Sequence, residues 1–274
     1  MLGAPATCVP PNQPAACPTL SIIVPTYRDG ARIYTNLLRL DAALAELGEP
    51  YEIIVVSDGN VDNTYEEALR VGAPHLHVHH YARNMGKGFA LRYGVGHSRG
   101  DIITFIDGDG DIDPAQIAVY LQIMRDTKAD IVVGSKRHPD SEVVYPLVRR
   151  IYSWAYQALL QVLFSLNVRD TQVGLKLFRR QVLADVLPRI VVKRFAFDLE
   201  LLVVAHHLGY TQVVEAPVRI GERFNSTINL KAIMSILQET AAIFYRRNIL
   251  HYYDLPRDSI PRDAELDEGS SALT

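Results

Sequence analysis

Three carboxylates spaced two residues apart, Asp107, Asp109 and Asp111, directly follow a short apolar run from Ile102 to Ile106. The run is long enough for a buried strand and too short for a helix. Carboxylates crowded at the end of a buried strand need a positive partner, because an unpaired charge is costly to bury. The pattern therefore favours a site for a hard divalent cation, Mg²⁺ or Mn²⁺, over its simpler alternative, an acidic turn.

Three other phosphate- or metal-binding loops are excluded by their spacing rules. An EF-hand starting at Asp107 would need Gly and Glu where Ile112 and Ala118 stand. No Gly-x-Gly-x-x-Gly follows the first predicted strand, which argues against a dinucleotide-dependent dehydrogenase. The segment Gly86-Lys87-Gly88 lacks the upstream Gly and the downstream Ser or Thr of a P-loop.

The elements that must position the carboxylates alternate between strands and helices. Strands are predicted at residues 20–24, 52–56, 75–80, 101–106 and 130–134, and helices at residues 30–47, 64–71, 88–97 and 114–127. This alternation predicts an α/β domain with a mostly parallel central sheet and helices on both faces.

Polar clusters follow three of the predicted strands where they end: Pro25-Thr26-Tyr27, Asp58 and Asp107-Gly108-Asp109. In open α/β sheets, ligands bind at the carboxyl ends of the strands. Because three clusters converge on one rim, the sequence predicts a nucleotide site there.

Composition narrows the class of partner. The 274 residues are 48% apolar and 22% charged, with a formal net charge of −3, which describes a globular protein with a real core. The charge gives no polyanion-binding signature, so nucleic acid is not an expected partner. Both cysteines, Cys8 and Cys17, precede the first predicted strand, which fits a reducing, cytoplasmic compartment.

Two segments predict amphipathic helices. Residues 151–168 contain no charge, but Ser153, Gln157, Gln161 and Ser165 recur every four residues, so we expect a helix on the protein body or on a bilayer surface, and no span. Residues 228–253 combine apolar, aromatic and basic side chains, which suits a peripheral membrane-interface helix; packing on the core is the alternative.

The motifs resemble, in order, those of family 2 glycosyltransferases of the GT-A fold. The matching motifs are Val24-Pro25-Thr26-Tyr27, Ile54-Val55-Val56-Ser57-Asp58, Arg83-Asn84-Met85-Gly86-Lys87-Gly88 and Asp107-Gly108-Asp109. Further along, Gly134-Ser135-Lys136, residues 170–178 and residues 195–200 resemble the branch that makes polyprenyl-phosphate sugars. Within it, the dolichyl-phosphate β-glucosyltransferases are most similar and the mannose synthases next.

This resemblance implies roles for individual residues on the donor side. The expected nucleotide-sugar-binding residues are Pro25, Tyr27, Asp29, Asp58, Lys87, Asp107, Arg223 and Ser226. Asp107 and Asp109, with Asp111 as a third contact, are the expected ligands of Mg²⁺ or Mn²⁺. The family's Gly-Ser-Lys near the diphosphate is replaced by Asn225-Ser226-Thr227, so that lysine is absent here.

On the acceptor side, the resemblance implies a polyprenyl or dolichyl phosphate held by Lys136, Arg149 and Ser153. A phosphate monoester is already anionic near neutral pH and needs cations more than a general base. Lys136 stands where the family has an arginine, and lysine lacks the bidentate fork. Asp170 and Asp198 would contact sugar hydroxyls, or act as the base for an alcohol acceptor.

Together these inferences predict four regions: a disordered proline-rich stretch at 1–18, a GT-A catalytic domain at 19–227, an interface helix at 228–253 and a disordered acidic tail at 254–274. The expected reaction is inverting, metal-dependent transfer of a hexose from a nucleotide sugar of the UDP-glucose or GDP-mannose type at a membrane face. A glycosyltransferase with a soluble hydroxyl acceptor, a nucleotidyltransferase and a non-catalytic sugar-nucleotide binder are the alternatives.

Overall fold

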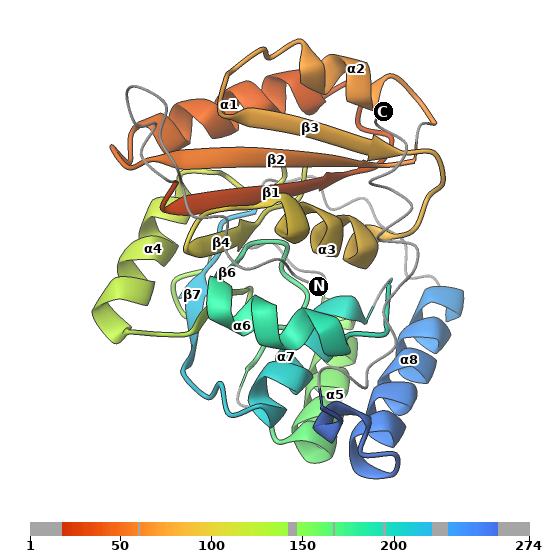
Figure 1. Cartoon of the computed structure of the whole chain (residues 1–274). Helices are drawn as coiled ribbons and strands as arrows, with labels where there is room; N and C mark the ends of the chain where they lie inside the picture. Colours follow the sequence, from red (N-terminus) through yellow and green to blue (C-terminus); the bar gives the residue numbers. More distant parts are fainter. Residues whose placement is uncertain are drawn as a thin grey trace.

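The computed structural model describes residues 18–59, 61–141, 147–166, 168–193, 196–220 and 230–256. Its centre is a seven-stranded sheet in the order β3-β2-β1-β4-β6-β5-β7 (Figure 1). The strands are β1 (Leu20–Thr26), β2 (Tyr51–Asp58), β3 (Leu76–Tyr81), β4 (Ile102–Phe105), β5 (Ile131–Ser135), β6 (Lys176–Arg179) and β7 (Val213–Pro217).

Helices cover both faces of this sheet. One face carries α1 (Ile33–Ala45), α2 (Thr64–Leu69) and α4 (Gln116–Thr127). The other carries α3 (Lys87–His97), α5 (Leu147–Phe164), α6 (Arg180–Val186), α7 (Phe197–His207) and α8 (Leu230–Asn248), with the short 3₁₀ helices η1 (Leu187–Arg189) and η2 (Tyr252–Asp254).

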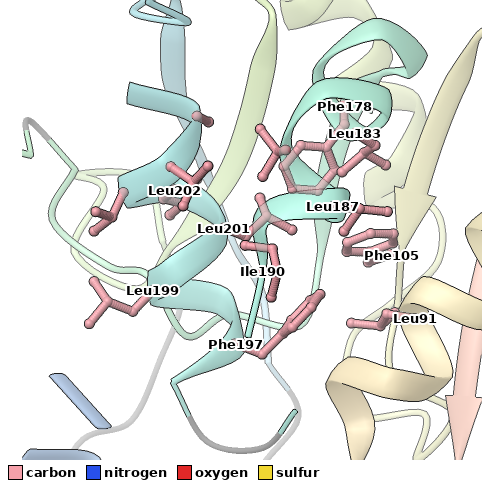
Figure 2. Close-up of a cluster of buried hydrophobic side chains, with 14 of the residues drawn as sticks. Leu91, Phe105, Phe178, Leu183, Leu187, Ile190, Phe197, Leu199, Leu201 and Leu202 are labelled. Atoms are coloured by element: carbon pink, nitrogen blue, oxygen red, sulfur yellow. The ribbon is translucent and has the colours of Figure 1, made fainter. Parts of the chain in front are cut away.

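The strand residues alternate between the two layers of core, as the period of two in a strand requires. In β1, Ile22 and Val24 pack with α1, whereas Ile23 packs with α3 on the opposite face. On the α3 face, Phe105 of β4 and Phe178 of β6 lie with their ring centroids 5.0 Å apart, among leucines of α6 and α7 (Figure 2). This aromatic contact joins the two halves of the sheet.

The sequence-based α/β prediction is confirmed, with each predicted strand and helix of the first half present within a few residues. The two predicted amphipathic helices are also present, but their predicted carboxyl ends, Val168 and Tyr253, are wrong. The first helix ends at Phe164, because Ser165 adopts a left-handed conformation with φ 56°. The second ends at Asn248, and His251 has a φ of 48° before η2 begins.

The sheet is parallel from β3 to β4, but β6 runs antiparallel to both of its neighbours, β4 and β5. Consequently the amino end of β6, at Lys176, lies on the same rim as the carboxyl ends of β4 and β5. The segment before β6 is thereby brought to the predicted nucleotide rim. Among the described residues, no helix is long and apolar enough to cross a membrane.

Candidate active site

The polar groups predicted to converge do meet on one rim of the sheet. Thr26 at the end of β1 pairs with Ser57 of β2, one residue before Asp58. Phe105, the last residue of β4, pairs with Ile23 of β1 and with Lys176 of β6. The loops after β1, β2 and β4 and the segment before β6 therefore surround one site.

Asp58 organises the loop that leads into α3. Its buried carboxylate accepts hydrogen bonds from the backbone N–H of Met85 (2.7 Å), the backbone N–H of Gly86 (3.0 Å) and the hydroxyl of Tyr81 (3.0 Å). Gly86 has a φ of 94°, a conformation that favours glycine. Asp58, which is predicted to bind the nucleotide, therefore also fixes the position of Lys87, the residue after Gly86.

The loop after β1 is built around Asp29, which is nearly buried. Its carboxylate accepts a hydrogen bond from the backbone N–H of Tyr27 (3.2 Å) and pairs with Arg32 (3.1 Å). The ring of Tyr27 is exposed, while Pro25 is buried within β1. Of these predicted base-binding and ribose-binding residues, Tyr27 offers the most accessible surface.

The acidic loop after β4 is held from beneath by α1. The side-chain amide of Asn36 donates a hydrogen bond to the carbonyl of Gly108 (2.9 Å), and Gly110 turns the chain with a φ of 77°. The carboxylate of Asp109 accepts a hydrogen bond from the backbone N–H of Asp111 (3.1 Å). This local bond orients Asp109 within the turn.

The electrostatics of the loop favour a cation. Burial, together with the nearby carboxylates of Asp107, Asp111 and Asp29, raises the pKa of Asp109 above its ordinary value, although the hydrogen bond from the Asp111 backbone opposes the shift. Within the described residues, no three His, Cys, Asp or Glu side chains are already arranged as a metal-ligand set. A hard cation bound by one or two carboxylates and by substrate phosphates needs no such closed set.

Lys87, the first residue of α3, contacts the acidic loop. Its Nζ lies 2.6 Å from Oδ1 of Asp107, and both side chains are partly exposed. Burial alone would lower the pKa of Lys87, but the carboxylates of Asp107, Asp198 and Asp109 outweigh it and raise that pKa. The ammonium group therefore stays charged beside the predicted metal loop.

A second lysine, Lys176, was not recognised as a site residue from the sequence. It is 1% exposed, and its Nζ donates to Oδ1 of Asp198 (2.8 Å) and to the carbonyl of Val173. Burial would raise the pKa of Asp198, but Lys176 and then Lys87 outweigh it and lower that pKa. The signal for Lys176 is its place between two apolar residues, Leu175 and Leu177, at the start of β6.

Gly174 was also missed. A Cβ atom there would overlap the carboxyl group of Asp107, so the absence of a side chain at this position lets the loop after β4 and the segment before β6 approach each other.

Lys136 and Asp170, predicted to contact the acceptor or the sugar, are brought together at the end of β5. The backbone N–H of Lys136 donates to Oδ2 of Asp170 (3.3 Å), and the backbone N–H of Gln172 donates to Oδ1 (3.0 Å). Both carboxylate oxygens of Asp170 therefore accept hydrogen bonds from backbone N–H groups of the rim.

Four predicted residues lie outside this geometry. Arg223 and Ser226 fall outside the described residues. Arg149 and Ser153 lie on the backbone of α5, but their side chains fall outside the described part of the chain.

Helices α5 and α8 pack side by side (Figure 1). Both carry exposed apolar side chains. The hydroxyl groups of Tyr156 and Thr240 lie 3.0 Å apart across this contact. Exposed fractions are 66% for Trp154 and 81% for Val162 on α5, and 55% for Met234 on α8. In the predicted polar stripe of α5, Gln157 is partly buried and donates to the carbonyl of Val168, whereas Gln161 is exposed.

Comparison with known proteins gives a family match and several relatives. The model of glycosyl transferase family 2 matches residues 21–187. The dolichyl-phosphate beta-glucosyltransferase of Drosophila melanogaster is 35% identical over 209 residues, covering 69% of this chain and 63% of that protein. The corresponding enzyme of Saccharomyces cerevisiae is 29% identical over 241 residues, covering 79% of this chain and 71% of the relative.

Solved structures share the architecture at lower identity. Mannosyl-3-phosphoglycerate synthase from Rubrobacter xylanophilus matches with a TM-score of 0.64 and 18% identity, over 90% of this chain and 78% of that one. Glucosyl-3-phosphoglycerate synthase from Mycobacterium tuberculosis, solved with Mn²⁺, uridine diphosphate and phosphoglyceric acid, matches with a TM-score of 0.62 and 19% identity, over 90% and 80%.

Proposed function

This chain belongs to glycosyl transferase family 2 and is a glycosyltransferase with the GT-A fold, and from that premise we propose that it transfers a hexose from a nucleotide sugar to a polyprenyl phosphate such as dolichyl phosphate. Its curated relatives of known activity, which match most of the chain, are named for that acceptor. The transfer proceeds by single displacement and inverts the anomeric centre.

The donor binds across the rim formed by β1, β2 and β4. Tyr27 offers an exposed ring for the base, and Asp29 with Asp58 orders the loops around the nucleoside. Asp107 and Asp109, with Asp111 beside them, present oxygen ligands of the kind that Mg²⁺ and Mn²⁺ prefer, and the mutual repulsion expressed at Asp109 is what a cation would relieve. A synthase with this fold has been solved with Mn²⁺, which supports the fit.

When bound, the divalent cation supplies positive charge to the departing diphosphate. The chain itself contributes the ammonium of Lys87, placed 2.6 Å from Asp107 and therefore beside the same phosphates. Asp198 is held by the buried Lys176, so its carboxylate stays ionised and fixed near Lys87. Arg223 and Ser226, which are also predicted to contact the diphosphate, complete the set of groups proposed to act there.

The carboxylates on the acceptor side are poorly suited to general-base work. Asp170 uses both oxygens to accept backbone hydrogen bonds, and Lys176 and Lys87 hold the pKa of Asp198 low despite its burial. A general base is most effective when its pKa lies near the working pH. An acceptor that is already anionic, such as a phosphate monoester, needs no base and fits this environment better than an alcohol.

One observation supports the proposal of a membrane-bound acceptor: the neighbouring helices α5 and α8 both expose apolar side chains. The outward side chains of α8 include Met234, Leu237 and Tyr245, at helical spacing on one stripe. Adjacent apolar patches on a surface mark a binding site for a protein or a membrane. Arg149 and Ser153, the residues proposed for the acceptor phosphate, belong to the same helix, α5. This arrangement favours peripheral attachment at a cytoplasmic membrane face.

The reaction is tested by product analysis. Purified protein is supplied with Mn²⁺ or Mg²⁺, with UDP-glucose or GDP-mannose, and with either a short polyprenyl phosphate or the matching polyprenyl alcohol. We expect a β-linked polyprenyl-phosphate hexose from one of the two donors and no transfer to the alcohol. Transfer to the alcohol alone would overturn the proposed acceptor, while leaving the family assignment intact.

The acceptor-binding residues are tested by Arg149→Ala and Lys136→Ala. Loss of a charge-assisted hydrogen bond costs about 1.5–3 kcal/mol, so each variant should raise the acceptor KM or lower transfer by roughly 10- to 150-fold. The double variant should be non-additive if both side chains hold one phosphate. Arg39→Ala, on the α1 side, is the control. Normal transfer by both single variants would remove these residues from the proposal.

Membrane attachment is tested with vesicles. Wild type should sediment with anionic phospholipid vesicles and be released by high salt or alkaline washing. The double variant Trp154→Ser/Val162→Ser removes the two most exposed apolar side chains among those described for α5 and should weaken sedimentation without lowering turnover of a water-soluble short-chain acceptor. Val119→Ser on α4, which is 48% exposed, is the matched control. Equal vesicle binding by wild type and the α5 variant would contradict this orientation.

A further inference from the structure

The position of Lys87 is fixed by two contacts of its neighbours, neither of which involves the ammonium group. On one side, the Asp58 carboxylate holds the backbone N–H groups of Met85 and Gly86, so the start of α3 cannot drift. On the other, a Cβ atom on Gly88 would lie 2.5 Å from Cδ2 of Phe197. Because a side chain is absent there, α3 packs directly against the start of α7.

This packing puts Lys87 near two carboxylates. Asp107 lies 2.6 Å from its Nζ, and Asp198, the residue after Phe197, is close enough to raise the pKa of Lys87. Asp198 is in turn paired with Lys176 at 2.8 Å. From the surface inward, the charges therefore alternate in sign: Asp107, Lys87, Asp198 and Lys176. The exposure of the side chains falls along this series, from about a third at Asp107 and Lys87 to 1% at Lys176.

An ammonium group and a metal ion cannot use the same carboxylate oxygen in the same way. Oδ1 of Asp107 is occupied by Lys87, yet Asp107 belongs to the loop proposed to receive the divalent cation. Two like charges a few ångströms apart repel strongly at the low effective dielectric of a partly buried site. The other oxygen of Asp107, Oδ2, lies where a Cβ atom on Gly174 would come within 2.1 Å of it, so a cation that uses Oδ1 would displace the ammonium group of Lys87.

We propose that Lys87 is the resident counter-ion of Asp107, that a divalent cation reaches this carboxylate by displacing the ammonium group, and that the fixed carboxylate of Asp198 retains the displaced group within the site. This inference rests on the proposed function, because it assumes the metal site of the acidic loop. It assigns Lys87 a role before any donor is bound, beyond contact with the nucleotide.

The arrangement couples the metal to the nucleotide. In the free enzyme, the cation must compete with Lys87, which weakens its binding. A nucleotide diphosphate offers the displaced ammonium group a new anionic partner, so the cation then binds without that competition. Coupling of this kind is reciprocal, and each ligand tightens the other by the same factor. A free metal ion would bind weakly to the empty site and tightly together with the nucleotide.

The test measures Mn²⁺ affinity by electron paramagnetic resonance, with and without UDP or GDP, whichever nucleotide the product analysis selects. Without nucleotide, Lys87→Met should bind Mn²⁺ about tenfold more tightly than wild type, because a neighbouring positive charge is gone. Added nucleotide should tighten Mn²⁺ binding strongly in wild type and much less in Lys87→Met. Lys87→Arg keeps the charge and should behave like wild type. Lys87→Gln serves as a second neutral variant if Lys87→Met does not fold.

Two controls separate this effect from net charge and from other metal sites. Lys193→Met removes a lysine whose Nζ lies 5.9 Å from the centroid of the Phe89 ring in α3, and it should leave Mn²⁺ affinity unchanged. Asp109→Asn should abolish Mn²⁺ binding in every background. Equal tightening by Lys193→Met and Lys87→Met would reduce the effect to net charge and overturn the proposal.

The part played by Asp198 is tested by removing the buried pair as a unit. Lys176→Met/Asp198→Asn leaves the net charge unchanged and avoids an unpaired buried charge. Without its second anchor, Lys87 should hold Asp107 more firmly, so Mn²⁺ binding without nucleotide should weaken a few-fold. In the Lys87→Met background the same double change should have no effect, since coupled residues are non-additive. An equal effect in both backgrounds would remove Asp198 from the proposal.

The outcomes distinguish this inference from the proposed function on which it rests. If wild type binds no Mn²⁺ even with nucleotide, the proposed metal site is wrong and the inference falls with it. If wild type binds Mn²⁺ together with the nucleotide, but Lys87→Met binds free Mn²⁺ no more tightly than wild type, the metal site stands and the counter-ion role of Lys87 is overturned.

Discussion

The two halves of the sheet hold their polar groups in different ways. In the parallel half, formed by β3, β2, β1 and β4, the site carboxylates follow the strands and are oriented largely by backbone N–H groups, as Asp58 is by Met85 and Gly86. In the mixed half, formed by β6, β5 and β7 with α6 to α8, charged side chains enter the core and are held by each other, as Lys176 and Asp198 are.

This difference separates chemistry from stability. The carboxylates of the acidic loop keep solvent and ligand access, and the rest of the fold does not depend on their charge. A buried ion pair has the opposite properties, because each charge is stable only while its partner is present. We therefore expect substitutions in the acidic loop to remove function and substitutions in the buried pairs to remove stability.

The largest expected effect is the loss of turnover in Asp109→Asn. The substitution keeps the shape of the side chain but removes a charge that would ligate the metal, which is worth several kcal/mol to the transition state, so kcat should fall by about a thousandfold. Because burial and neighbouring carboxylates raise the pKa of Asp109, its charge does not stabilise the fold, and the melting temperature should stay equal or rise. Steady-state kinetics and thermal unfolding of the same sample check both.

Near-normal turnover of Asp109→Asn with added Mn²⁺ would contradict the expectation that substitutions in the acidic loop remove function. Asp113→Asn, in the same loop, is the matched control, because the Asp113 carboxylate is exposed and accepts a hydrogen bond from the backbone N–H of Ala115. It should retain activity.

The second prediction reverses the pattern in the mixed half. Asp198→Asn leaves the ammonium group of Lys176 buried without a partner charge, which costs about 3–5 kcal/mol of unfolding free energy. Replacing both residues, as Lys176→Met/Asp198→Asn, should recover most of that loss. Urea denaturation of the three proteins gives the comparison. A single variant as stable as the double one would show that the pair is not a buried unit.

The same pair predicts a pH dependence. The folded pKa of Asp198 is lowered, chiefly by Lys176 acting against burial, so the carboxylate contributes stability above its unfolded value of about 4. That contribution is lost as the pH falls through the lowered folded value. Wild type should therefore lose more stability than the double variant as the pH falls below about 4.

Much of the parallel half is predictable because its signals are local. Each strand there is an apolar run that ends in a polar cluster, and each helix has apolar residues at helical spacing, such as Ile33, Leu37, Leu40 and Leu44 of α1. Since parallel strands carry their ends to one rim, the meeting of Asp58 with the acidic loop follows from the order of the elements.

The mixed half was less predictable because its partners are distant in sequence. Lys176 and Asp198 are separated by α6 and η1, and no spacing rule connects them. The antiparallel direction of β6, which brings Gly174 against Asp107, is seen in its pairing with β4 and β5, and no local pattern within Lys176–Arg179 indicates it. Only the lysine between two apolar residues signals a buried charge.

The third prediction returns to the parallel half, at Asp58. In Asp58→Asn, the retained oxygen can still accept from the backbone N–H of Met85, but an NH2 group replaces Oδ2 and faces the backbone N–H of Gly86 (3.0 Å), and an unmet buried donor costs about 1–3 kcal/mol. The loss should be smaller than that of Asp198→Asn, because no unpaired charge remains. Asp41→Asn neutralises the carboxylate that accepts a hydrogen bond from the Tyr51 hydroxyl (2.7 Å), away from the rim, and should leave turnover unchanged. A larger loss in Asp58→Asn than in Asp198→Asn would invert the comparison.

The smallest expected effect tests whether burial, and not the number of charges, separates the two classes of contact. Two links tie η2 to α7: the Tyr253 hydroxyl donates to the fully buried Glu200 (2.6 Å), and His207 lies 2.6 Å from the half-exposed Asp254. The hydrogen bond from His207 lowers the pKa of Asp254, so this contact stabilises above pH 4 and is lost as the pH falls. Solvent and salt screen it, so His207→Gln should cost no more than about 1 kcal/mol, and less at high ionic strength. A cost near that of Asp198→Asn, measured by urea denaturation in low and high salt, would mean that exposed pairs stabilise this half as strongly as buried ones.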